Sequence, residues 1–229
     1  MPILQSPLLE LATFGPENLA LVQNGNVKRI ELCSNKLADG LTPDLAVFKQ
    51  YRAFTDIDIR VMIRPKAGHF TYTEIEFERM QNDLLTFKNK GANGFVFGIL
   101  NSDGTIDTTK NKKLVDLAYP LPCTFHKAFD SLPDYKLGIE QCIQIGFKQL
   151  LSSGLKPSVI EGIDNLKKMI QLAANQLSII PGGGIRSSNL ATIHQQLDCE
   201  IYHSAAITDN GNQANLNEVK QLLTLLECR

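Results

Sequence analysis

Short apolar runs alternate with longer amphipathic stretches along the whole chain. Ranges 44–54, 73–90 and 165–176 have the apolar spacing of helices, and Ile75, Met80, Leu84 and Phe87 are expected on one buried helix side. This alternation predicts a parallel sheet covered by helices. The strands are predicted at eight apolar runs: LLELAT (8–13), RIELC (29–33), IRVMIR (59–64), GFVFG (94–98), CTFH (123–126), QLLSS (149–153), SIIPG (178–182) and IYHS (201–204).

Glycine recurs at three of the junctions between a helical stretch and the next strand. Gly25, Gly91 and Gly146 occupy these places, where glycine suits the left-handed backbone that ends many helices. The recurrence indicates one repeated βα unit, so a single domain is expected over residues 1–229. Eight such units predict a (β/α)8 TIM barrel with parallel strands.

A doubly wound open sheet is the main alternative to a barrel. Its dinucleotide-binding form needs the pattern GxGxxG after a strand, and Gly182 and Gly184 are followed by Ser187 where the third glycine belongs. The phosphate-binding pattern GxxxxGK[ST] is also absent from the sequence. No nucleotide cofactor is therefore predicted.

Charge and cysteine content narrow the range of partners. The chain has 23 Lys and Arg against 24 Asp and Glu, a net charge of −1, so no general attraction to nucleic acid or anionic lipid is expected. No apolar run reaches the roughly 18–20 residues that span a membrane. The five cysteines are scattered without a CxxC pair, and the amino-terminal stretch does not have the charge pattern of a signal peptide. These features favour a reducing, cytoplasmic location.

Two carboxylates lie in the middle of apolar strands. Glu10 in LELA and Glu31 in IELC would be costly to bury without a partner. One interpretation is a structural ion pair, with Arg64 as the partner. The other is a catalytic role for Glu10, Glu31 and Arg64, because perturbed carboxylates gather at functional sites and barrel enzymes react at strand carboxyl ends.

Histidines end two of the predicted strands. His126 closes the fifth strand in TFHKAFD and is a candidate general acid or base, with Asp130 four residues later. A hydrogen bond from the imidazole to a neighbouring carboxylate for packing is the alternative. His203 is a weaker candidate, since the next residue, Ser204, could be the one that faces inward.

The segment PGGGIR (181–186) follows the seventh strand. Glycine lets backbone amides approach an anion, and barrels often bind phosphate after strands seven and eight. The predicted anion-binding residues are Ser153, Gly182, Gly183, Gly184 and Ser204. A tight turn that simply requires glycine is the alternative.

A metal site would depend on one thiol at the predicted barrel mouth. Cys33 is the thiolate candidate, with His126, His203 and a glutamate as further ligands, a set suited to copper or zinc. No local ligand spacing supports it, and a small buried hydrophobic cysteine is the more common case.

The motifs together resemble the CutC family. They are IELCSNKLADGLTPD (30–44), VMIRPKAGHF (61–70), VFGILNSDGTID (96–107), TFHKAFD (124–130), LLSSG (150–154), PGGGIR (181–186) and HSAA (203–206), in family order. The resemblance implies a cytoplasmic, single-domain TIM barrel that forms a homodimer and has a role in copper homeostasis. The family's usual RPRGGDF differs here at Lys66, Ala67 and His69, and HRAFD differs at Lys127.

Two functions follow from these observations. The resemblance implies a cytoplasmic protein of copper homeostasis that binds a copper ion. The polar residues at the strand ends favour instead an enzyme that acts on a small phosphorylated or carboxylated metabolite, with Glu10, Glu31 and His126 in acid–base roles. Neither the substrate nor the reaction follows from the sequence.

Overall fold

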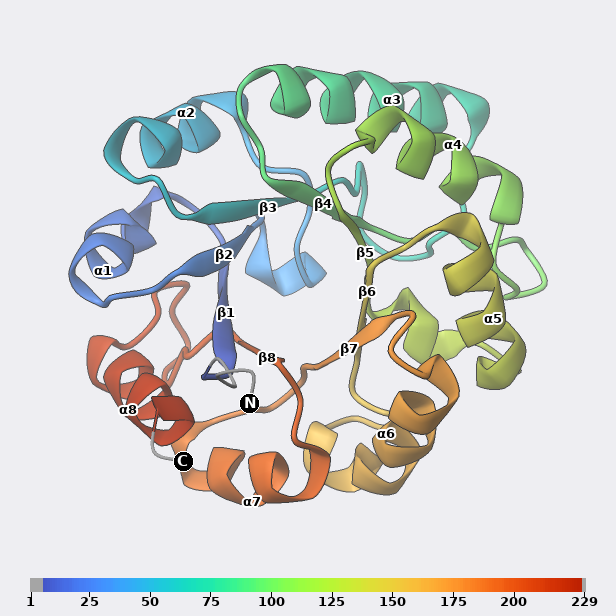
Figure 1. The fold of residues 1–229 in the computed structure, drawn as a ribbon. Coiled ribbons are helices and arrows are strands. Elements are labelled where there is room, and N and C mark those ends of the chain that lie inside the picture. Colours follow the sequence, from blue (N-terminus) through green and yellow to red (C-terminus); the bar gives the residue numbers. More distant parts are fainter. Residues whose placement is uncertain (1–5, 228–229) are drawn as a thin grey trace.

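The computed structural model describes residues 6–227, so Cys228 and the first five residues lie outside it. It is a (β/α)8 barrel, with eight parallel strands surrounded by helices (Figure 1). The strands are β1 (Leu8–Thr13), β2 (Arg29–Leu32), β3 (Asp58–Met62), β4 (Gly94–Phe97), β5 (Cys123–Phe125), β6 (Gln149–Ser152), β7 (Ser178–Pro181) and β8 (Ile201–Ser204). The helices are α1 (Leu19–Asn24), α2 (Leu45–Phe54), α3 (Glu74–Asn89), α4 (Thr108–Ala118), α5 (Tyr135–Ile145), α6 (Val159–Ala173), α7 (Ser187–Leu197) and α8 (Leu216–Glu227).

The strands follow one another around the barrel in chain order. Each strand from β1 to β6 pairs in parallel with the next one, and β8 pairs with β1. The seam between β7 and β8 is joined by a parallel bridge between Gly182 and His203. Strand carboxyl ends therefore meet on one rim, and β3 lies across the barrel from β7. No helix within residues 6–227 is long and apolar enough to cross a membrane.

Three local predictions were wrong. Ile75 is 81% exposed, and Phe77 joins Met80, Leu84 and Phe87 on the buried side of α3. A spacing of three, four and three keeps these four side chains on one face, whereas residue 75 lies outside that series. Helix α6 begins at Val159 rather than near residue 165, because the Ser158 side chain caps it by accepting from the Glu161 amide.

The third error concerns the first glycine junction. Gly91 and Gly146 have φ of 91° and 102°, as expected for helix ends, but Gly25 has φ of −91°. The left-handed residue at that turn is Asn26, with φ of 55°. Asparagine tolerates this conformation better than other residues that carry a Cβ.

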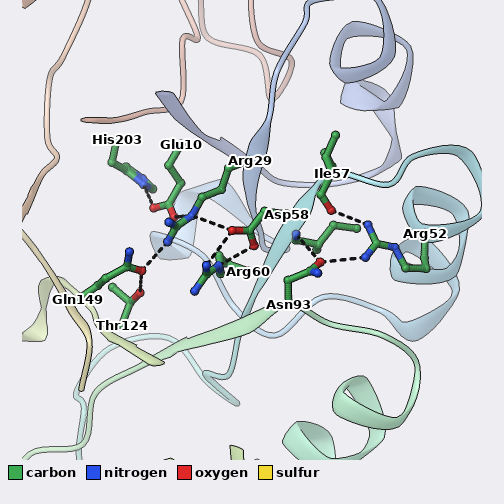
Figure 2. A network of polar contacts seen from close by, with 11 residues as sticks. Glu10, Arg29, Arg52, Ile57, Asp58, Arg60, Asn93, Thr124, Gln149 and His203 are labelled. Atoms are coloured by element: carbon green, nitrogen blue, oxygen red, sulfur yellow. Dashed lines mark hydrogen bonds and ion pairs between the residues drawn. The ribbon is translucent and has the colours of Figure 1, made fainter. Parts of the chain in front are cut away.

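Polar side chains fill the part of the barrel interior near the amino ends of the strands. Arg29 is in register with Glu10 on one side and Asp58 on the other, and it donates to Gln149 at 2.6 Å. Asp58 holds Arg60 through two contacts of 2.7 Å (Figure 2). The network ties β1, β2, β3 and β6 together beneath the rim.

A glycine contact fixes the loop after β6. A Cβ placed on Gly162 of α6 would lie 1.9 Å from the carbonyl oxygen of Ser153 and 2.9 Å from the Cα of Gly154. Both obstacles are backbone, so they cannot move aside as a flexible side chain could. The close approach sets α6 directly against the loop that carries Ser153.

Gly162→Ala is therefore expected to destabilise the fold by about 2 kcal/mol, the size of an overpacking effect reduced by alanine's better helix propensity. Gln171→Ala, at an exposed position of the same helix, is the control. Urea unfolding monitored by circular dichroism measures both. Equal stability of the two variants would contradict the tight contact.

Candidate active site

A cavity of about 520 Å³ opens at the carboxyl ends of the strands. Its wall includes Glu31 from β2, Arg64 after β3, His126 after β5 and His203 from β8. This volume is within the range typical of sites for small molecules.

Glu10 lies beneath this cavity rather than on its wall. It is completely buried, and its partner is Arg29, whose Nε lies 2.7 Å from Oε2. The suggested pairing with Arg64 is therefore wrong. Burial raises the pKa of Glu10, but Arg29 and His203 outweigh it and bring the pKa to about 2. The carboxylate is ionised at neutral pH, and His203 Nδ1 donates to its Oε1 at 2.9 Å (Figure 2).

Glu31 is the carboxylate that faces the cavity. It is 4% exposed, and the Cys33 thiol donates to its Oε1 at 3.3 Å. Its Oε2 is buried and has no hydrogen-bond partner among the described residues. Burial and the neighbouring Glu10 charge raise the pKa of Glu31, against the lowering effect of His203. A carboxyl with a raised pKa beside a cavity suits general acid–base chemistry.

His203 lies between the two carboxylates. Burial disfavours its charged form, but Glu31 and Glu10 outweigh that effect and raise the pKa of His203. Glu10, Glu31 and His203 each offer one ligand atom within 4.8 Å of the others, a spacing that a metal ion could accept. Arg29 pairs with Glu10, and the raised pKa of His203 favours a second positive charge beside the two carboxylates, so side chains of the protein already serve this cluster.

His126 lines the cavity as a neutral imidazole with one free donor. Burial and the nearby Arg64 charge lower the pKa of His126 to about 3. Its Nδ1 accepts from the Ala128 amide at 3.2 Å, so the ring proton is on Nε2, which has no partner within residues 6–227. The alternative prediction was a hydrogen bond from this imidazole to a carboxylate. The hydrogen bond formed instead joins Nδ1 to the Ala128 amide.

Arg64 is a buried guanidinium, 4% exposed, with the Tyr72 hydroxyl and three carbonyl groups around it. It donates to the carbonyl oxygens of Ala38, Gly40 and Gly68, and its Nε has no partner among the described residues. Its Cζ lies 4.9 Å from the ring centre of Phe70, and the His126 ring lies 4.9 Å from the same ring. Both groups thus contact Phe70, and Arg64 is near enough to His126 for its charge to lower the pKa of that imidazole.

Asp130 and the two predicted serines shape the rim through hydrogen bonds. Asp130 accepts from the side chains of Ser152 and Ser153 and from the amides of Ser153 and Leu155. Ser204 Oγ donates to the Ile185 carbonyl at 2.8 Å and accepts from the Ala206 amide. Asp130 and Ser204 therefore hold the loops after β6 and β7, which is a positioning role.

The glycine turn contributes to the cavity wall at Gly183 and Gly184, while Gly182 packs against Leu151 and His203. The start of α7 just beyond it already has an acidic partner, since Glu218 accepts from the amide and the hydroxyl of Ser187 at 2.7 Å each. Lys127, Lys156 and Arg186 also line the cavity and are the cations available to an anion near this turn.

Cys33 does not belong to a cluster of metal ligands within residues 6–227. It is buried with Met62 and Val96, and burial together with Glu31 raises the pKa of its thiol well above the usual value. The other sulfur beside it is the Met62 thioether, which lines the cavity, whereas Cys33 itself is not among the lining residues. His126 Nδ1 is engaged, so the soft donors at this point are one thioether and a thiol that its surroundings keep protonated. The donors present therefore do not fit a Cu(I) site at Cys33.

Several residues of the site were not found from the sequence. Arg29 precedes Glu31 by two positions, so strand alternation could have placed both inside the barrel. Phe70 and Lys156 lie in loops, where no periodic signal indicates which side chain turns toward the cavity.

Comparison with known proteins gives one consistent family. The model of the CutC family matches residues 8–208. The mouse copper homeostasis protein cutC homolog is 38% identical over 199 residues, which are 87% of this chain and 73% of the relative. The homolog from Caenorhabditis elegans is 36% identical over 89% of this chain and 82% of its own length.

Solved structures agree with this assignment. CutC from Streptococcus agalactiae superposes with a TM-score of 0.82 and 32% identity, over 87% of this chain and 98% of that one. An aldolase, QR15, has a TM-score of 0.68 at 10% identity, covering 98% of this chain and 97% of its own. The second likeness shows the barrel fold alone.

Proposed function

The chain belongs to the CutC family, and from the geometry of its cavity we propose that it is an enzyme that acts on a small anionic metabolite by acid–base chemistry. One observation carries the proposal. Three residues that line the cavity each hold a buried polar atom without a hydrogen-bond partner within the described chain: Glu31 Oε2, Arg64 Nε and His126 Nε2. Each unsatisfied buried group costs about 1–3 kcal/mol, so a ligand that pairs with all three is favoured.

The three atoms differ in chemistry, which assigns their roles. Arg64 Nε and the neutral His126 Nε2–H are donors, suited to an anionic group and to negative charge that develops beside it. Glu31 Oε2 is an acceptor with a raised pKa, suited to take a proton from the substrate and return it. Glu10 lies beneath the cavity, and its charge raises the pKa of Glu31 while that of His203 lowers it.

A turnover screen tests the proposal. Wild-type protein is incubated with a defined mixture of small phosphorylated and carboxylated metabolites, and each compound is followed by mass spectrometry. We expect at least one compound to be consumed, and Arg64→Gln to slow its consumption. Complete recovery of every compound, with folded protein confirmed by circular dichroism, would contradict the enzymatic proposal.

Copper handling is the second candidate, because the relatives in mouse and Caenorhabditis elegans are named copper homeostasis proteins. A direct Cu(I) role would need the Cys33 thiolate, which burial and the Glu31 charge disfavour. We propose that any role in copper homeostasis runs through the metabolite rather than through a thiolate site at Cys33.

Cys33→Ser is accordingly expected to change Cu(I) affinity less than about threefold, since the hydroxyl replaces a soft ligand that does not reach the cavity. Competition with a chromophoric Cu(I) chelator under anaerobic conditions measures the affinity. The melting temperatures of both proteins provide the control for folding. A loss of tenfold or more in the folded variant would favour direct copper binding.

A further inference from the structure

We infer that the cavity takes a phosphorylated carboxylic acid, with its carboxylate beside Arg64 and His126 and its phosphate at the Gly183–Gly184 turn. The inference rests on the proposed function in using the same cavity, and it names the class of substrate. The observations behind it are two separate cationic regions on opposite walls.

The first region is buried and has one charge. Arg64 and His126 are each 4% exposed, and both pack against Phe70. Their free donors, Nε and Nε2, belong to one cation and one neutral ring. A small planar monoanion matches this pair, because two nitrogen donors can serve the two oxygens of a carboxylate.

The second region is open and has three cations. Gly183 has φ of 127°, and a Cβ there would lie 3.3 Å from Lys127 Nζ and 3.1 Å from the Cβ of Ser153. Arg186 donates to the carbonyls of its neighbour Ile185 and of Ile207, and it forms no ion pair within residues 6–227. With Lys156, which also lines the cavity, Lys127 and Arg186 suit the larger charge of a phosphate at a turn without side chains.

The barrel order places these regions across the cavity from each other. Arg64 follows β3 and the glycine turn follows β7, and four steps around the eight-stranded sheet separate these strands. Glu31 and His203 line the cavity from β2 and β8. In total, five Lys or Arg side chains line the cavity against three carboxylates, and Asp130 already accepts four hydrogen bonds. A ligand with an anionic group at each end therefore complements the cavity.

Calorimetric titration with three related probes tests the inference. 3-Phosphoglycerate has both groups, glycerol 3-phosphate lacks the carboxylate, and glycerate lacks the phosphate. For wild type we expect 3-phosphoglycerate to bind at least about tenfold tighter than either of the others, as expected when one charged contact is added. In Arg64→Gln, 3-phosphoglycerate should no longer bind more tightly than glycerol 3-phosphate. In Lys127→Gln, the difference in affinity between 3-phosphoglycerate and glycerate should become smaller. Lys127 is exposed, so that variant is expected to fold even if Arg64→Gln does not.

The outcomes separate this inference from the proposed function. No measurable binding of 3-phosphoglycerate, or an affinity no greater than that of either single-group probe, would overturn the inference. If Lys127→Gln lowered the affinities for glycerate and for 3-phosphoglycerate by the same factor, the inference would be overturned as well. Selective binding of 3-phosphoglycerate without turnover of any metabolite would support the inference and contradict the enzymatic proposal. Turnover of a compound that needs only one anionic group would support the enzymatic proposal and overturn the inference.

Discussion

Glu31→Gln is expected to lower turnover by about 100- to 10,000-fold, the range supplied by a positioned general acid or base. The amide keeps the size of the carboxyl group and can still accept the Cys33 hydrogen bond, but it cannot take up a proton. Because the pKa of Glu31 is raised, wild-type kcat/KM should fall as the pH decreases through that pKa, where the base becomes protonated.

The matched control is Asp39→Asn, the same chemical change at an exposed carboxylate on the rim of the same cavity. Its turnover is expected to stay within about threefold of wild type, since a rim charge acts through a high dielectric. Initial rates across a range of pH compare the three proteins. A Glu31→Gln enzyme as active as the Asp39→Asn enzyme would remove Glu31 from the chemistry.

Arg29→Met is expected to cost about 3–5 kcal/mol of stability, because it leaves the Glu10 carboxylate buried without its cation. Breaking an exposed pair should cost far less, so Lys112→Met, which removes the partner of Asp116, is expected to cost at most about 0.5 kcal/mol. Urea unfolding at neutral pH measures both variants. Similar losses in the two would contradict a central role for Arg29.

The double variant Glu10→Gln with Arg29→Met gives a second check. It removes both charges and is expected to recover part of the stability lost in the single variant. The pH dependence has a definite sign, since the pKa of folded Glu10 is about 2, below the usual 4.5. Its contribution to stability is complete above the unfolded pKa and is lost as the pH falls toward 2. The double variant has no carboxylate at position 10, so it should not show the loss of stability that protonation of Glu10 causes at low pH.

The barrel could be predicted because its strands are short apolar runs that repeat around glycine junctions. β1, β6 and β8 lie within their predicted runs, and even Glu10 and Glu31 did not obscure the strands that contain them. Helix details were harder: the burial of Phe77 instead of Ile75 depends on how α3 rests on the sheet. The start of α6 depended on a single capping side chain, Ser158.

The sequence was enough to predict which strand residues belong to the site, but not which side chains contact one another there. Strand ends meet on one rim, so Glu10, Glu31, Arg64 and His126 were expected in one pocket. The last three line the cavity, together with His203, whereas Glu10 lies beneath it. The pairing of Glu10 with Arg29 instead of Arg64 depends on register between neighbouring strands, which one sequence does not reveal. Phe70 reaches His126 from a distant loop, and only the folded chain brings those rings together.

One comparison decides most directly between the cavity and the thiol as the basis of function: the rate at which wild type, Glu31→Gln and Cys33→Ser consume the compound identified in the screen. We predict a loss of at least about 100-fold for Glu31→Gln. For Cys33→Ser we predict less than tenfold, because serine can donate the same hydrogen bond to Glu31. The opposite order, with Cys33→Ser inactive and Glu31→Gln close to wild type, would contradict the account.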